Sequence, residues 1–251
     1  MRFVKQTTWT LALCMLGSAL GTIAQAQDEQ TARMRTALAS PARPAEAKAR
    51  DAARKPLETV QFLGIKTGQT VIDVIAVGGW FTEVLSAAVG PSGKVLAQNP
   101  DFFVQREGFA ATEKAQHERL GNVQAVHGEL PAAGIVGQAD AAITALNMHD
   151  IYNSPAGEAG AVALAKGVYD ALKPGGVFGV IDHVGIAGQN NAQFHRLQLQ
   201  QAKDVLTKAG FTIEAESNLL ANPADDHMKG VRDQTVSGHT DQFLLRARKP
   251  K

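Results

Sequence analysis

The stretch that decides the fold is Thr70-Val-Ile-Asp-Val-Ile-Ala-Val-Gly-Gly-Trp-Phe-Thr-Glu-Val-Leu85. It begins with a short apolar run around Asp73, which is typical of a buried strand. Gly78 and Gly79 allow a tight turn, and the residues from Trp80 onward have the spacing of an amphipathic helix. A strand, a glycine turn and a helix in this order are typical of the start of an α/β nucleotide-binding fold.

The rest of the chain alternates strands with helices, which indicates a mostly parallel sheet with helices on both faces. The predicted strands are 71–75, 94–98, 123–127, 140–146, 177–181, 211–216 and 241–246. The predicted helices are 56–63, 80–88, 112–120, 159–172 and 191–209. The last two strands come close together, so we expect an α/β protein with a Rossmann-like, mostly parallel, seven-stranded sheet.

The first residues have the three parts of a secretory signal peptide. Arg2 and Lys5 precede an apolar stretch from Trp9 to about Ile23, and Ala24-Gln25-Ala26 follows as a cleavage site. This apolar stretch is shorter than the roughly 20 residues that a membrane-spanning helix needs. We therefore expect residues 1–26 to be removed, no membrane span in the remaining chain, and a periplasmic or secreted protein.

The composition of the predicted mature chain excludes several kinds of chemistry. The only cysteine, Cys14, lies in the predicted signal peptide, which excludes disulfides, thiolate metal sites and cysteine nucleophiles. Loss of two basic residues changes the balance from 25 basic and 24 acidic side chains to 23 against 24, a net charge of −1. That balance does not indicate nucleic acid or an anionic membrane as a partner. We interpret 27–55 as a linker and a peripheral helix, and 56–251 as one domain.

Four groups of polar residues and glycines follow predicted strands. They are 73–79, 98–101, 147–150 and 182–183. Because ligands bind beyond the carboxyl ends of the strands in open sheets of this kind, we expect these groups to surround one pocket.

Two motifs give the chain a resemblance to a known family. The first is the quoted strand, turn and helix, and the second is Ala171-Leu-Lys-Pro-Gly-Gly-Val-Phe-Gly-Val-Ile-Asp-His183. Together they resemble class I S-adenosylmethionine-dependent methyltransferases over roughly 56–249. Within that superfamily the chain looks most similar to exported bacterial predicted methyltransferases. The residues that carry this closer likeness are Gly78-Gly-Trp-Phe-Thr-Glu83, Asn147-Met-His-Asp150, Asp182-His183 and Asn222-Pro-Ala-Asp-Asp-His227.

The resemblance implies the class I methyltransferase fold, S-adenosylmethionine as the cofactor, and a set of residues around it. Those residues are Asp73, Gly78, Gly79, Trp80, Asn99, Glu129, Leu130 and Asn147. Asn99 falls where the family usually has a ribose-binding acid, and Glu129 with Leu130 falls where the adenine binds. The family also has glycines where this chain has Ile75 and Val77. Val77 is β-branched and is expected to resist a positive φ.

The predicted function is methyl transfer to an unidentified small-molecule or protein group in the cell envelope. His149 and His183, both after strands, are the candidate catalytic bases because imidazole titrates near neutral pH. His195 and Arg196 are interpreted as a surface pair. One alternative is a ligand-binding protein without catalysis on the same scaffold, which the altered glycine turn favours. Another is a metal-assisted hydrolase that uses histidines and aspartates of the 149–150, 182–183 and 225–227 groups. Because these residues lack a tight metal-binding motif, no metal is included in the predicted site.

Overall fold

The computed structural model describes residues 10–130 and 133–251, with side chains from residue 24 onward. Its centre is a seven-stranded sheet in the order β3-β2-β1-β4-β5-β7-β6. The strands are β1 Thr70–Val74, β2 Lys94–Asn99, β3 Val123–His127, β4 Ala139–Ala145, β5 Leu172–His183, β6 Thr212–Ser217 and β7 Gln242–Arg248. Strands β1 to β5 are parallel to one another, whereas β7 is antiparallel to both β5 and β6. The predicted α/β class and seven-stranded sheet are confirmed.

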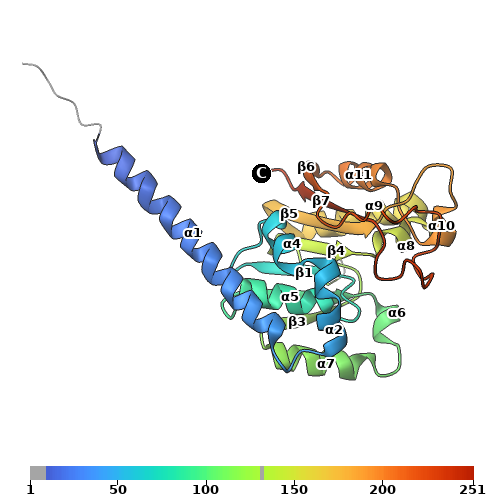
Figure 1. Ribbon diagram of the computed structural model, residues 1–251, viewed down its shortest axis with the longest axis horizontal. Coiled ribbons are helices and arrows are strands. Elements are labelled where there is room, and N and C mark those ends of the chain that lie inside the picture. The colour runs from blue at the N-terminus through green and yellow to red at the C-terminus, as the bar shows by residue number, and fades with distance from the viewer. Residues whose placement is uncertain (1–9, 131–132) are drawn as a thin grey trace, which may run out of the picture.

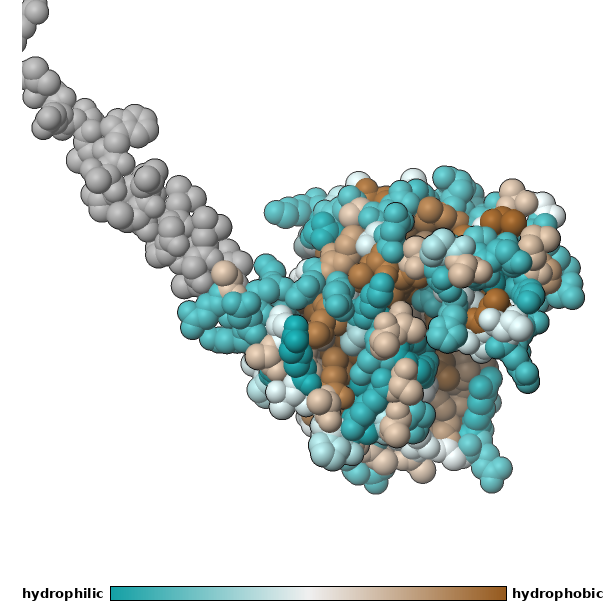
Figure 2. Space-filling view, viewed as in Figure 1, coloured by the Kyte–Doolittle hydropathy of each residue, from teal (hydrophilic) through white to brown (hydrophobic). Residues whose placement is uncertain are grey.

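Helices cover both faces of this sheet (Figure 1). They are α1 Thr10–Ala39, α2 Ala45–Ala49, α3 Asp51–Arg54, α4 Pro56–Leu63, α5 Trp80–Val89, α6 Asp101–Val104, α7 Phe109–Leu120, α8 Met148–Tyr152, α9 Gly157–Ala171, α10 Asn191–Phe194 and α11 Leu199–Lys208. Buried residues of α1, α4 and α5 share one apolar cluster, and those of α9 and α11 share the other. Figure 2 shows that hydrophilic residues cover most of one face, with hydrophobic residues visible mainly in the furrows.

The segment predicted as a linker is largely helical and packed. From Gln27 the chain continues helix α1, on which Gln30, Met34 and Leu38 are buried. Gln30 Nε2 donates to the carbonyl oxygens of Ile65 and Ala88 at 3.0 and 2.9 Å, which fixes the helix beside α5. The linker prediction differs from the structure because these residues, spaced four apart, form a buried stripe on one side of the helix.

The signal-peptide prediction lies partly outside the described residues. Residues 1–9 are not described, and α1 continues through the predicted cleavage site after Ala26. Within the described ranges, none of the helices has both the length and the apolar character that a membrane span requires.

The predicted helix over 191–209 is two helices, α10 and α11, with an extended segment between them. His195 has a φ of 54°, and Leu197 forms a parallel bridge with Val184 at the end of β5. The Leu197 N–H donates to the His183 carbonyl at 3.0 Å, and its own carbonyl accepts from Gly185 at 2.8 Å. These bonds hold the segment in extended form and place His195 next to the carboxyl end of the sheet.

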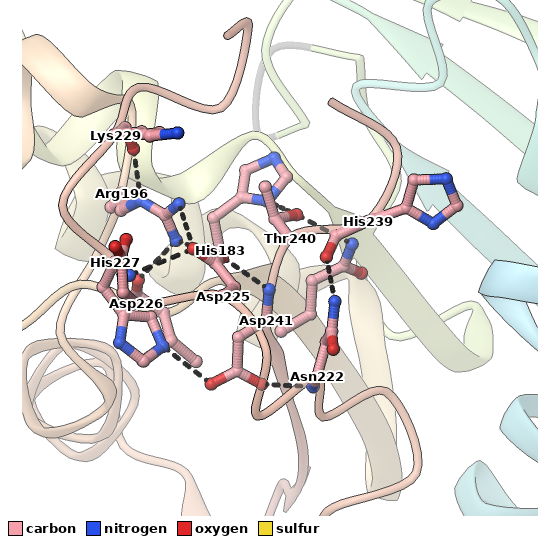
Figure 3. A network of polar contacts seen from close by, with 12 residues as sticks. His183, Arg196, Asn222, Asp225, Asp226, His227, Lys229, His239, Thr240 and Asp241 are labelled. Carbon is pink, nitrogen blue, oxygen red and sulfur yellow. Dashed lines mark hydrogen bonds and ion pairs between the residues drawn. The ribbon is translucent and has the colours of Figure 1, made fainter. Parts of the chain in front are cut away.

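Arg196, interpreted above as a surface residue, is completely buried. Its two terminal nitrogens donate to both carboxylate oxygens of Asp225 at 2.9 and 3.0 Å (Figure 3). Its Nε donates to the Lys229 carbonyl and Nη1 to the Val184 carbonyl, both at 3.0 Å. Asp225 also accepts from the Asp241 backbone N–H at 2.8 Å. This bidentate pair therefore ties the loop before β7 to the end of β5.

Removal of either partner of this ion pair is expected to destabilise the protein strongly. Arg196→Met leaves Asp225 buried and unpaired, so we expect a loss of about 3–5 kcal/mol in the free energy of unfolding. The double variant Arg196→Met/Asp225→Leu removes both charges and should lose much less than the two single variants added together. Urea unfolding measures these differences, with Arg232→Ala on the exposed part of the same loop as the control. A loss in Arg196→Met no larger than in the control would contradict the assignment.

Candidate functional site

A cavity of about 1110 Å³ lies at the carboxyl ends of the parallel strands. The strand order switches direction here, because β2 and β3 lie on one side of β1 and β4 lies on the other, and ligands bind at such a point in open α/β sheets. The cavity is bounded by the turn after β1, the segments after β2, β3 and β4, and parts of α3 and α9. Six of the predicted cofactor-binding residues line it: Asp73, Gly78, Gly79, Trp80, Glu129 and Asn147.

The turn between β1 and α5 has a left-handed backbone at every second residue. The φ angles are 58° at Ile75, 46° at Val77 and 68° at Gly79. A positive φ costs little at Gly79, where a Cβ would also lie 2.0 Å from Gln116 Oε1. At Ile75 and Val77 it is unusual, because a β-branched side chain crowds the backbone in this region. The chain therefore adopts at Val77 the conformation that its side chain was expected to resist.

Two amide side chains at the end of β2 hold this strained turn. The Ile75 N–H donates to Gln98 Oε1 at 3.0 Å, and the Val77 N–H donates to Asn99 Oδ1 at 2.8 Å. Asn147 Nδ2 donates to the Ile75 carbonyl at 3.2 Å from the segment after β4. Residues in sparsely populated backbone regions persist only where their surroundings fix them, as these three side chains do.

Asn99 and Leu130 do not line the cavity. Asn99 is 1 % exposed, and its Nδ2 donates to Glu113 Oε1 at 3.1 Å, so both ends of its amide are used within the protein. Leu130 is 2 % exposed and belongs to the apolar core. In this structure Asn99 supports the turn through its hydrogen bond to Val77. Glu129 is exposed and lines the cavity, whereas the next residue, Leu130, points into the apolar core.

Asp73 and Arg54 bring opposite charges to one side of the cavity. Burial raises the pKa of Asp73 to about 6, although Thr82 Oγ1 donates to its carboxylate at 2.6 Å. Arg54 lies 4.8 Å from the centre of the Trp80 ring, and burial lowers its pKa to about 10. Trp80 itself is 4 % exposed and donates from Nε1 to the Ala47 carbonyl, so it mainly packs. Arg54 was not predicted, because its place in the site depends on packing between α3 and α5.

His149 lies behind Asp150, which does line the cavity. Its Nδ1 donates to Asp182 Oδ1 at 2.6 Å, and its Nε2 lies 3.2 Å from Asp150 Oδ1. Burial alone lowers the pKa of His149, but hydrogen bonds and charges from Asp150 and Asp182 outweigh burial and raise it to about 9. The His149 ring is therefore protonated on both nitrogens and positively charged at neutral pH, which makes it a poor base there.

His183 has the opposite electrostatic state. Burial lowers its pKa to about 4, and its Nδ1 is 2.7 Å from Thr240 Oγ1. The ring is therefore uncharged at neutral pH, and its low pKa makes it a weak base. Neither His183 nor His149 lines the cavity, although the two ring centres lie only 5.5 Å apart.

Glycine at position 77 is expected to relieve backbone strain. Val77→Gly removes a β-branched side chain from a positive φ, and we expect a gain of about 1 kcal/mol in the free energy of unfolding after the entropy cost of glycine. Thermal or urea unfolding measures it. The matched control is Val136→Gly, at an exposed valine with an ordinary φ, which should lose stability. An equal loss in both variants would show that Val77 is not strained.

The chain is similar in structure to several solved proteins. A SAM-dependent methyltransferase from Aquifex aeolicus superposes with a TM-score of 0.56 at 18 % identity, over 80 % of this chain and 98 % of that one. Fibrillarin from Aeropyrum pernix, solved with S-adenosyl-L-methionine bound, gives 0.52 at 14 % identity, over 79 % and 76 %. The cyclase SpnF gives 0.59 at 17 % identity, over 79 % and 81 %. No protein-family model matches the sequence, and no curated protein matches it.

At these identities the similarity shows the fold and does not show the activity. The similar structures include proteins described as methyltransferases and one described as a cyclase, so proteins with this fold are described by more than one activity. Strand order, the antiparallel β7 and these superpositions agree with one another. The chain has the class I S-adenosylmethionine-dependent methyltransferase fold.

Proposed function

We propose that this protein is an S-adenosylmethionine-dependent methyltransferase. The observation that carries the proposal is the turn after β1. It keeps a left-handed backbone at Ile75 and Val77 although neither is glycine, and it opens into the large cavity. Backbone strain of this kind is concentrated at functional sites, because a fold has no reason to keep it elsewhere.

The charges beside the turn suit the amino-acid end of the proposed cofactor. S-adenosylmethionine carries a cationic ammonium and an anionic carboxylate at that end. Asp73 offers an acceptor for the ammonium, and Arg54 offers a donor for the carboxylate. Among the described residues Arg54 forms no ion pair, so its guanidinium is available. Glu129 and Asn147 supply further polar groups on the cavity wall.

Methyl transfer by in-line displacement depends mainly on the position of the two reactants. When bound, the cofactor supplies an activated methyl group next to the cavity. An acceptor that must lose a proton needs a base, and of the two histidines only His183 is uncharged at neutral pH, although its low pKa makes it a weak base. A role for His183 requires that a water molecule or the acceptor reaches it behind the cavity wall.

Titration calorimetry with S-adenosylmethionine and S-adenosylhomocysteine tests the proposed cofactor. We expect micromolar binding of at least one, and a loss of about 10- to 100-fold in Asp73→Ala and Arg54→Ala, since each removes a charged contact. Binding should also weaken as the pH falls below about 6, because Asp73 is then protonated. Val77→Gly should bind no more weakly than the natural chain, and Arg35→Ala, on the exposed side of α1, should bind equally well.

The possible results separate the candidate functions. Binding that is lost in Asp73→Ala and accompanied by transfer of a methyl group to an acceptor supports a methyltransferase. Binding without transfer to any tested acceptor favours a ligand-binding protein on this scaffold. A folded protein that binds neither compound would overturn the proposal.

We also propose that the chain is exported and cleaved after Ala26. The packing of α1 supports this proposal, because residues 24–29 are exposed and, among the side chains that the structure describes, the first buried one is Gln30. Cleavage would therefore leave the described core contacts of this helix in place.

The mass of the protein recovered from the cell envelope tests export. We expect a chain that starts at Gln27, and a longer chain in Ala26→Phe, because cleavage requires a small residue at that position. Ala37→Phe, an exposed alanine further along α1, is the control and should be cleaved normally. A natural chain that keeps its first 26 residues would contradict the proposal.

A further inference from the structure

Two histidines and an aspartate from separate segments meet beside the cavity. His149 and Asp150 belong to α8, after β4, and His195 lies between α10 and α11. One ligand atom from each residue can be chosen so that all three lie within 4.8 Å of one another. These residues come together only because the segment after α10 is extended.

The separations suit ligands of a single metal ion. Asp150 Oδ1 is 3.2 Å from His149 Nε2 and 2.8 Å from His195 Nδ1. Nitrogen and oxygen ligands lie about 2.0–2.2 Å from a first-row divalent ion, so two of them on one ion are roughly 3–3.6 Å apart. Only small side-chain shifts are needed to seat an ion among these atoms.

A buried carboxylate fixes the first of these ligands. Asp182 is completely buried, and its two oxygens accept from His149 Nδ1 at 2.6 Å and from the His149 backbone N–H at 2.8 Å. The second nitrogen, Nε2, is thereby directed toward Asp150. Histidines that bind metal almost always donate their other ring N–H to such a carboxylate, which sets the tautomer and the ring orientation.

The backbone fixes the third ligand. His195 has a φ of 54°, in the left-handed region that non-glycine residues rarely adopt. The next residue, Arg196, is held by Asp225, so the strained backbone is kept in place and the imidazole remains beside Asp150. A costly conformation that brings a histidine to an aspartate and a second histidine indicates a functional constraint.

The two carboxylates of the cluster favour a cation, and an ion bound at His149 Nε2 takes the place of the proton that this nitrogen carries at neutral pH. Asp150 and Asp182 bring two carboxylates to His149, and both rings of the cluster contact Asp150. We propose that His149, Asp150 and His195 bind one divalent transition-metal ion, with Asp182 as the positioning residue for His149. Two imidazoles and a carboxylate suit Zn²⁺, Mn²⁺, Fe²⁺ and Co²⁺. Because Asp150 lines the cavity, an ion bound to it would lie at the edge of the space that a small molecule can fill.

Metal titration of the purified, untagged chain tests this site without S-adenosylmethionine. After treatment with a chelator, Co²⁺ is added and followed by visible absorption, and Zn²⁺ and Mn²⁺ by calorimetry. We expect one ion per chain with a micromolar or lower dissociation constant for at least one metal. Asp150→Asn and His195→Ala should weaken binding by at least 10-fold, and Asp182→Asn by about 10- to 100-fold.

Matched variants separate loss of a ligand from loss of the fold. Asp150 and His195 are only partly covered, so their variants are expected to unfold at the same urea concentration as the natural chain. His127→Ala removes a histidine that pairs with Glu113 at 2.8 Å outside the cluster, and it should bind metal normally. Absence of binding in the natural chain, or equal binding in His195→Ala and His127→Ala, would overturn the proposal. Neither result bears on methyl transfer, because the cofactor is absent from the titration.

Discussion

The conformation of the site depends on hydrogen bonds from the turn after β1 to two amide side chains at the end of β2. Gln98 and Asn99 accept the N–H groups of Ile75 and Val77, two residues that would otherwise prefer an extended backbone. These bonds curl the chain from the end of β1 to the start of α5, which places Asp73 and Trp80 on the same wall of the cavity. At Ile75 and Val77 the left-handed backbone, which glycine adopts readily, is instead maintained by hydrogen bonds to Gln98 and Asn99.

Much of the fold could be predicted from local patterns. The apolar runs and the glycine turns located all seven strands, because alternation and breaks in hydrophobicity are set by nearby residues. The predicted helix over 191–209 was wrong near residues 195–198, because the break there depends on a contact with a residue far away in the sequence. Arg196 is held by Asp225, which lies 29 residues further along the chain, and no pattern near 196 indicates this partner. Gln30, Met34 and Leu38 form a buried stripe with a spacing of four residues. This stripe was not predicted, because the segment is rich in alanine and shows little contrast between polar and apolar positions.

The sequence predicted where the cavity lies in the fold better than it predicted which side chains point into it. The rule that ligands bind beyond the ends of parallel strands identified four of the predicted cofactor residues that line the cavity, and the family resemblance added Trp80 and Glu129. Neither could give the direction of each side chain. Asn99 turns inward because the N–H of Val77 needs an acceptor, and His149 turns toward Asp182 for its Nδ1 proton. Arg54 was missed because only the folded chain brings α3 against Trp80.

The position of β7 has a consequence for the order in which the sheet is completed. Strand β7 lies between β5 and β6, although it follows both of them in the sequence. Until residues 242–248 have left the ribosome, β6 has no partner in the sheet and β5 exposes an unpaired edge. The sheet is therefore completed only when β7 enters between two strands made before it, and until then the unpaired edges of β5 and β6 are open to edge-to-edge association with other chains.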